Sequence, residues 1–145
     1  MKAFIKYPLL ILFLFVLDQV SKSLLQAKDI ALFPFVSFSY AQNTGAAFSL
    51  FQNQNLIFVV LSFVALIFIL YYFKEYPLAL SFILAGLLGN LADRLLFGFV
   101  RDFISIGSFP IFNVADSCNT IGIVLLLYAF WKEEKLNKAR AHQKA

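Results

Sequence analysis

The chain has very little charge for its length. Only 14% of its 145 residues are charged, whereas 61% are hydrophobic. A soluble domain of this size keeps much of its surface in water and cannot hide so much apolar surface. The composition therefore excludes a soluble globular domain and predicts an integral membrane protein, with residues 1–145 forming a single domain.

Cysteine and histidine are almost missing. Cys118 is the only cysteine, which excludes an intrachain disulfide and paired cysteine ligands for a metal. His142 is the only histidine and lies in the charged C-terminal segment, which excludes Ser-His and Cys-His nucleophile systems and a histidine-rich metal site. Chemistry must therefore use carboxylates, lysine, arginine or hydroxyls, and neither a metal nor an organic cofactor is implied.

What the chain does contain is four apolar segments long enough to cross a bilayer. The first starts with basic residues, as a secretory signal peptide does, but no small-x-small cleavage site follows it, so we expect it to be retained. We predict a mainly α-helical membrane protein with four transmembrane helices, at about residues 5–25, 55–73, 77–97 and 113–131.

Two connections between the spans have the composition of strands. Residues 31–39 and 100–112 are rich in Phe, Val and Ile and are broken by Gly and Pro. Their backbone amides could not lie unpaired in hydrocarbon. We therefore predict a small β-sheet and loop region at the outer membrane surface.

The basic residues indicate the orientation. The predicted outer loops hold only Lys28 and Arg101, whereas eight basic residues lie on the other side: Lys2, Lys6, Lys74, Lys132, Lys135, Lys138, Arg140 and Lys144. The positive-inside rule places both termini, including a basic tail at 132–145, in the cytoplasm. Such flanks are attracted to anionic membrane lipids. They lack the aromatic and polar side chains of a nucleic-acid site, so no nucleic-acid partner is expected.

Polar residues gather at the outer ends of the spans. Asp18 and Lys22 are four apart, so they share a helix face and can pair. Asp93 and Arg94 are adjacent and form a second candidate pair. An ionisable residue in a bilayer costs roughly 2.5–3.5 kcal/mol at the helix centre, so several at one depth indicate a built site.

Asp102 and Asp116 are the carboxylates best suited to catalysis. Their only obvious local partner, Arg101, can point to the opposite face of a strand. Two carboxyl groups in one site do not both ionise easily, so one can act as acid and the other as base, as in aspartic proteases. The alternatives are that Asp116 is a helix N-cap, that Asp102 is a solvated loop acid, and that the charge pairs are purely structural.

Five segments together resemble a known family. They are DQVSK at 18–22, NTGAAF at 43–48, GNLADR at 89–94, VRDF at 100–103 and FNVAD at 112–116. In this order among four spans, they are similar to the lipoprotein signal peptidase (signal peptidase II) family of bacterial intramembrane aspartic peptidases.

The resemblance implies that Asp102 and Asp116 form a catalytic dyad in the bacterial cytoplasmic (inner) membrane, near its outer face. It implies site-supporting or substrate-binding roles for Asp18, Lys22, Asn43, Gly45, Asn90, Asp93, Arg94 and Asn113. The implied substrate is a prolipoprotein that carries a diacylglyceryl group on the cysteine after the scissile bond. We also expect a monomer, and we hypothesise that the Phe-rich loop at 31–48 clamps over the substrate.

Two other classes of protein compete with a peptidase. A small proton-coupled transporter would use membrane carboxylates, but carriers place them near the midplane, and here the inner halves of the spans are apolar. A non-catalytic membrane assembly subunit would tolerate the substitutions Asp102→Asn and Asp116→Asn, whereas a peptidase would not.

Overall fold

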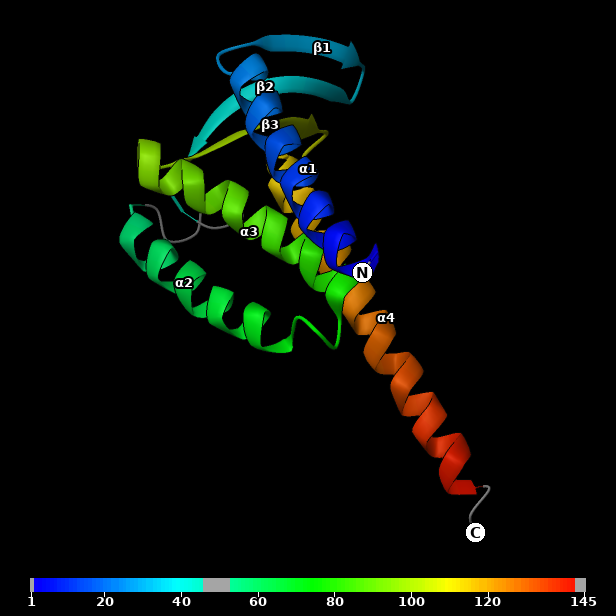
Figure 1. Ribbon diagram of the computed structural model, residues 1–145. Coiled ribbons are helices and arrows are strands. Elements are labelled where there is room, and N and C mark those ends of the chain that lie inside the picture. Colours follow the sequence, from blue (N-terminus) through cyan, green and yellow to red (C-terminus); the bar gives the residue numbers. More distant parts are fainter. Residues whose placement is uncertain (1, 46–52, 143–145) are drawn as a thin grey trace.

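Four long helices and one three-stranded sheet make up the computed structural model, which describes residues 2–45 and 53–142. The elements in chain order are α1 (Lys2–Leu25), β1 (Asp29–Phe33), β2 (Val36–Asn43), α2 (Asn55–Tyr72), α3 (Pro77–Phe97), β3 (Val100–Ile106) and α4 (Val114–His142). Helix α3 packs against the other three helices, and the sheet lies across one end of the helices (Figure 1).

All four helices are long and apolar enough to cross a membrane, which confirms the predicted fold class. Helix α2 carries no charged residue and exposes most of its side chains, among them Leu56, Ile67 and Tyr71. Such a surface is unfavourable in water and suits contact with lipid. The chain is a multi-pass membrane protein.

Helix α3 has clear start and stop signals. Pro77 occupies the first helical position, where its fixed φ and missing N–H cost nothing. The helix ends at Gly98, which adopts a left-handed conformation with φ 81° and donates its N–H to the Arg94 carbonyl at 3.2 Å. This turn directs the chain into β3, and the observed bounds match the prediction.

Helix α4 continues past Trp131, where the sequence predicted the span to end and a basic tail to begin. The following segment is rich in Lys, Glu, Ala and Leu, which favour helix, and it remains helical to His142. This part extends away from the other helices (Figure 1). The change in composition therefore does not mark the end of the helix.

The sheet is antiparallel with β2 in the centre. Strand β2 pairs with β1 on one side and with β3 on the other, and its pairing with β3 shifts register between Phe38 and Ala41. After β3 the chain turns back, and Phe112 forms an isolated bridge with Ile104. The predicted strands are confirmed, and this return brings the start of α4 next to β3.

Two glycines let three helices approach closely. A methyl carbon on Gly86 would lie 2.3 Å from the carbonyl oxygen of Ala115 in α4. One on Gly89 would lie 2.5 Å from Oδ2 of Asp18 in α1. The absence of side chains at these positions of α3 brings the polar ends of α1 and α4 against the same helix.

Candidate active site

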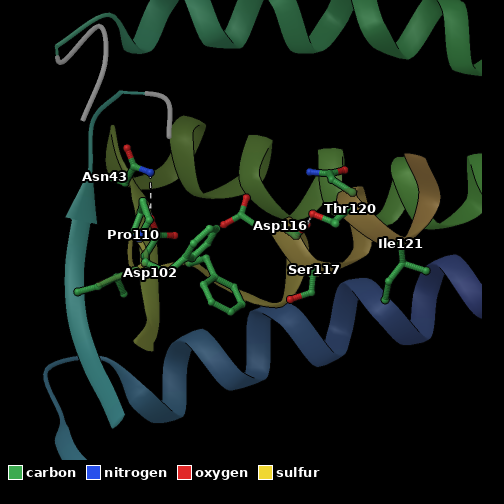
Figure 2. Close-up of a pocket in the computed structure, with 11 residues that line it drawn as sticks. Asn43, Asp102, Pro110, Asp116, Ser117, Thr120 and Ile121 are labelled. Atoms are coloured by element: carbon green, nitrogen blue, oxygen red, sulfur yellow. Dashed lines mark hydrogen bonds between the residues drawn. The ribbon is translucent and has the colours of Figure 1, made fainter. Parts of the chain in front are cut away.

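A cavity of about 560 Å³ lies between β3 and the first turns of α4. Asp102 of β3 and Asp116 of α4 both line it, as Figure 2 shows. The remaining lining is mostly apolar and includes Phe109, Ile111 and Phe112. Two carboxyl groups from different elements therefore face one partly apolar space.

Asp102 is held by two side-chain amides. Asn43 Nδ2 donates to its Oδ2 at 2.9 Å, and Asn113 Nδ2 donates to its Oδ1 at 2.6 Å. The residue is only 2% exposed. Burial, and next the charge of Asp116, raise the pKa of Asp102 to about 7, although the two amide bonds act in the opposite direction.

Asp116 belongs to the cap of α4. Its Oδ2 accepts the backbone N–H of Asn113 at 3.1 Å, while Asn113 Oδ1 accepts the backbone N–H of Asp116 at 2.9 Å. This reciprocal pair is a capping box in which Asn113 is the N-cap. The alternative that Asp116 itself is the N-cap is wrong, because Asp116 is the third residue of the helix.

Asn90 and Asn113 connect the two carboxyl groups. Asn90 Nδ2 donates to Oδ1 of Asp116 at 2.8 Å, and Asn113 Nδ2 donates to the Asn90 amide oxygen at 3.1 Å. Since Asn113 also donates to Asp102, a continuous path of hydrogen bonds runs from Asp102 to Asp116. Each amide is fixed in orientation by these contacts.

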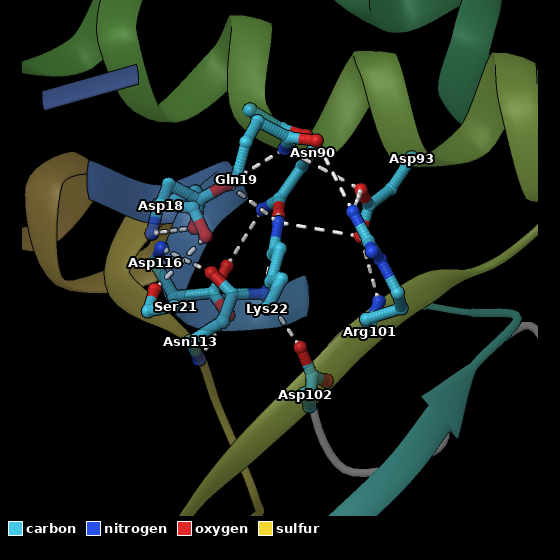
Figure 3. A network of polar contacts seen from close by, with 12 residues as sticks. Asp18, Gln19, Ser21, Lys22, Asn90, Asp93, Arg101, Asp102, Asn113 and Asp116 are labelled. Carbon is cyan, nitrogen blue, oxygen red and sulfur yellow. Dashed lines mark hydrogen bonds and ion pairs between the residues drawn. The ribbon is translucent and has the colours of Figure 1, made fainter. Parts of the chain in front are cut away.

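Asp18 and Lys22 lie behind this path and form the predicted pair, 2.8 Å apart and almost fully buried (Figure 3). Lys22 Nζ also donates to the Asn90 amide oxygen at 3.0 Å. Asp18 Oδ1 accepts the backbone N–H of Ala115 at 2.8 Å, which ties α1 to the start of α4. The pair is thus part of the site rather than an isolated contact at the membrane surface.

The predicted pairing of Asp93 with Arg94 is wrong. Asp93 forms ion pairs with Arg101 at 2.8 Å and with Lys22 at 3.4 Å. Arg94 donates instead to the Gly45 carbonyl at 3.3 Å and lies over the Phe58 ring. Adjacent residues on a helix point in different directions, which separates the two side chains.

Gly45 lies in the loop after β2, close to the site. Its backbone N–H donates to Oδ1 of Asn43 at 3.0 Å, so the Asn43 amide is held from both ends. Residues 46–48 of the hypothesised clamp lie outside the described residues. The structure thus gathers every sequence-predicted site residue around Asp102 and Asp116.

Two residues of the polar network were missed from the sequence. Gln19 donates to Oδ2 of Asp18 at 3.0 Å and accepts from Arg101 Nη2 at 3.1 Å. Arg101 points away from the cavity, as its place beside Asp102 in a strand predicted, but it joins the network behind it. A second ionisable residue beside Asp102 in a strand at the membrane surface was the available signal.

Sequence comparisons identify proteins that are similar to this chain over most of its length. The family described as signal peptidase (SPase) II matches residues 10–132. The chain is 42% identical to the lipoprotein signal peptidase of Streptococcus pyogenes serotype M1 and 41% identical to that of S. pyogenes serotype M5 (strain Manfredo). In both cases the similarity covers 88% of this chain and 94% of the relative.

Two solved structures are similar to the whole fold. Both are described as bacterial membrane enzymes determined by the in meso method, at 2.3 Å and 1.9 Å, and both are 32% identical to this chain. The alignment with the first has a TM-score of 0.84 and covers 89% of both chains. The alignment with the second has a TM-score of 0.77 and covers 86% of this chain and 92% of the solved one. From the matched sequence, the similar relatives and the shared fold, we conclude that the chain belongs to the signal peptidase II family.

Proposed function

We propose that the chain removes the signal peptide from diacylglyceryl-modified prolipoproteins with Asp102 and Asp116 as its catalytic dyad. Peptidase activity on prolipoproteins follows from membership of the family. The transporter and assembly-subunit alternatives receive no support from the relatives. The observation that supports the dyad is that the two carboxyl groups line one cavity and are joined through Asn113 and Asn90.

The roles of the two acids follow from their surroundings. Asp102 has a raised pKa of about 7 and holds the proton in the resting site. Asp116, which accepts from Asn90 and from the Asn113 backbone, is the ionised partner and general base. The two carboxyl groups titrate as a coupled pair, and the one proton of that pair resides mainly on Asp102.

Hydrolysis then takes two steps, each with two proton transfers. The Asp116 carboxylate removes a proton from water, the water oxygen bonds to the scissile carbonyl carbon, and Asp102 gives its proton to the carbonyl oxygen. When the C–N bond of the resulting diol breaks, Asp116 gives its proton to the leaving amine and Asp102 recovers a proton from the diol. The dyad ends as it began, and no metal or cofactor is required by this scheme.

We place the site at the outer face of the bacterial cytoplasmic membrane, with both termini in the cytoplasm. Eight basic residues on the opposite side favour this orientation. The diacylglyceryl chains of the substrate can then stay among membrane lipids while the peptide enters the cavity. Both acids and their supporting network come from one chain, so we propose that the enzyme works as a monomer in which residues 1–145 form a single domain.

The dyad is tested by Asp102→Asn and Asp116→Asn, each made separately. Neither changes shape much, so we expect normal insertion and a loss of kcat of at least about 10³-fold for both. The assay is cleavage of a diacylglyceryl prolipoprotein in detergent micelles, with folded protein measured by size-exclusion chromatography. Asp29→Asn, at an exposed acid of β1, is the control. Native cleavage rates in either dyad variant would remove the assignment.

A further inference from the structure

Arg101 is a buried cation that the two-carboxylate mechanism does not use. It is next to Asp102 in β3, but its side chain lies on the opposite face of the strand and is 4% exposed. Its guanidinium lies 4.5 Å from the centre of the Phe97 ring. A cation in such a place requires compensation by nearby groups.

Asp93 provides that compensation at three points. Arg101 Nη2 donates to Oδ1 of Asp93 at 2.8 Å, and Arg101 Nε donates to Oδ2 at 3.2 Å. The Arg101 backbone N–H also donates to Oδ2, at 2.9 Å. The two-pronged contact fixes both the side chain and the strand position next to Asp102.

The charges behind the cavity balance in pairs. Asp18 and Asp93 are the buried acids, and Lys22 and Arg101 are the buried cations. Lys22 Nζ donates to the Asn90 amide oxygen at 3.0 Å and forms ion pairs with Asp18 at 2.8 Å and Asp93 at 3.4 Å. Because Arg101 occupies both oxygens of Asp93, Lys22 is left at the longer distance from Asp93 and keeps its contact with Asn90.

Gln19 carries a second effect of Arg101 (Figure 3). Its Oε1 accepts from Arg101 Nη2 at 3.1 Å, which turns its amino group toward Oδ2 of Asp18 at 3.0 Å. The other oxygen of Asp18 accepts the N–H of Ala115, the residue before Asp116. Arg101 is therefore linked to Asp116 by two chains of contacts. One runs through Asp93, Lys22 and Asn90, and the other runs through Gln19, Asp18 and the backbone of Ala115. Arg101 is also adjacent to Asp102 in β3.

We propose that Arg101 is a positioning residue for the hydrolysis. By neutralising Asp93 and orienting Gln19, it keeps Lys22 in contact with the Asn90 amide oxygen. This contact directs the Asn90 amino group toward Asp116. Without Arg101, Lys22 moves toward the unneutralised Asp93, and the Asn90 amide oxygen loses one of its two described donors, keeping the one from Asn113. The proposal rests on the proposed dyad and adds to it a residue that lies outside the cavity.

The test compares Arg101→Met, which removes the charge, with the double variant Arg101→Met/Asp93→Asn, which removes both charges of the pair. We measure kcat and KM for a diacylglyceryl prolipoprotein, per folded molecule. For Arg101→Met we expect kcat to fall about 10- to 100-fold with KM within about twofold, since small displacements of catalytic groups have effects of this size. The kcat of the double variant should be at least about fivefold higher than that of Arg101→Met, because Lys22 is no longer drawn away from Asn90. Arg140→Met, at an exposed arginine of α4, is the control and should change neither constant by more than about twofold.

A purely structural role for Arg101 predicts less folded protein with unchanged kcat per folded molecule, and that result would overturn the proposal. A double variant no more active than Arg101→Met would also overturn it. If Arg101→Met does not fold, Arg101→Lys replaces it: one ammonium cannot hold both Asp93 oxygens and Gln19, so kcat should fall at least about threefold.

Asp102→Asn is assayed in the same experiment. Activity in that variant refutes the dyad itself, whereas an inactive Asp102→Asn with native kcat in the Arg101 variants refutes only the role of Arg101.

Discussion

At the scale of single residues, the two acids of the cavity differ in their surroundings. Asp102 is almost completely buried and accepts from the side-chain amides of Asn43 and Asn113. Asp116 is half-buried and accepts from the Asn90 side chain and from a backbone N–H. Amide donors favour the ionised carboxylate, but burial favours the protonated one, and for Asp102 burial is the larger effect on its pKa. Unequal surroundings are what the proposed acid and base roles require of two identical side chains.

The raised pKa of Asp102 predicts how activity depends on pH. A carboxyl group with a pKa near 7 keeps its proton below that pH and loses it above. The state with one proton on the dyad is therefore lost as the pH rises through about 7, and kcat/KM should fall about tenfold per pH unit beyond it. Steady-state cleavage between pH 5 and pH 9, at constant ionic strength and in one detergent, measures this. A kcat/KM that still rises at pH 9 would contradict it.

Residue identities could be predicted better than residue partners. Asp102 and Asp116 were proposed as catalytic because membrane acids without local partners stand out. The Asp18–Lys22 pair was predicted correctly because four-residue spacing is a fixed property of a helix. The partner of Asp93 was missed because Arg101 reaches it only through the left-handed turn at Gly98, which a helical pattern does not describe.

At the scale of elements, the β1–β2 hairpin carries two strongly exposed phenylalanines. Phe33 and Phe35 are 72% and 76% exposed at its turn. The hairpin is nevertheless fixed to β3, since the Gly107 N–H donates to the Phe35 carbonyl at 2.8 Å. Two large apolar side chains on an anchored turn are suited to contact with lipid or with a lipidated peptide.

We therefore predict that Phe33→Ala/Phe35→Ala raises KM for the lipidated precursor. Loss of apolar contact should raise KM about 3- to 30-fold and leave kcat nearly unchanged, because neither side chain lines the cavity. Phe13→Ala, at an exposed phenylalanine in the span of α1, serves as the matched control in the same micelle assay. Unchanged KM in the double variant would count against the clamp.

Element boundaries followed from the sequence where a local signal exists. Pro77 and Gly98 mark both ends of α3, and the predicted range was confirmed. The end of α4 has no such signal at Trp131, because charged helix formers continue the helix even where the apolar residues stop. The register shift in β2 was also beyond prediction, since it depends on pairing with a strand far along the chain.

At the scale of the whole molecule, α3 is the central helix and α2 is peripheral. The sequence predicted four spans but not this arrangement. In lipid, an apolar residue is equally suited to the protein interior and the outer surface, so no hydrophobic stripe marks the face that packs. Small residues are the available guide, and Gly86, Gly89 and Gly122 of α3 and α4 all lie at close helix contacts.

The proposed orientation makes a prediction about accessibility in cells. In a Cys118→Ala background, a cysteine replacing Ser108 should react with a membrane-impermeant maleimide added outside intact spheroplasts. A cysteine replacing Ala139 should react only after the membrane is permeabilised. The opposite labelling pattern would place the cavity on the cytoplasmic side and refute the orientation while leaving the dyad untouched.

The cap of α4 has a consequence for substrate binding. The bonds between Asn113 and Asp116 that begin this helix also set the spacing of the acids, since Asn113 holds Asp102 as well. For the proposed dyad, the entropy of arranging the two acids is therefore lost during folding, before any peptide binds, and binding energy remains for distorting the scissile bond. Any change that frays the first turn of α4 releases that arrangement. Substituting Asn113 should therefore disturb both the start of the helix and the contact with Asp102, whereas substituting Asp102 leaves the cap intact.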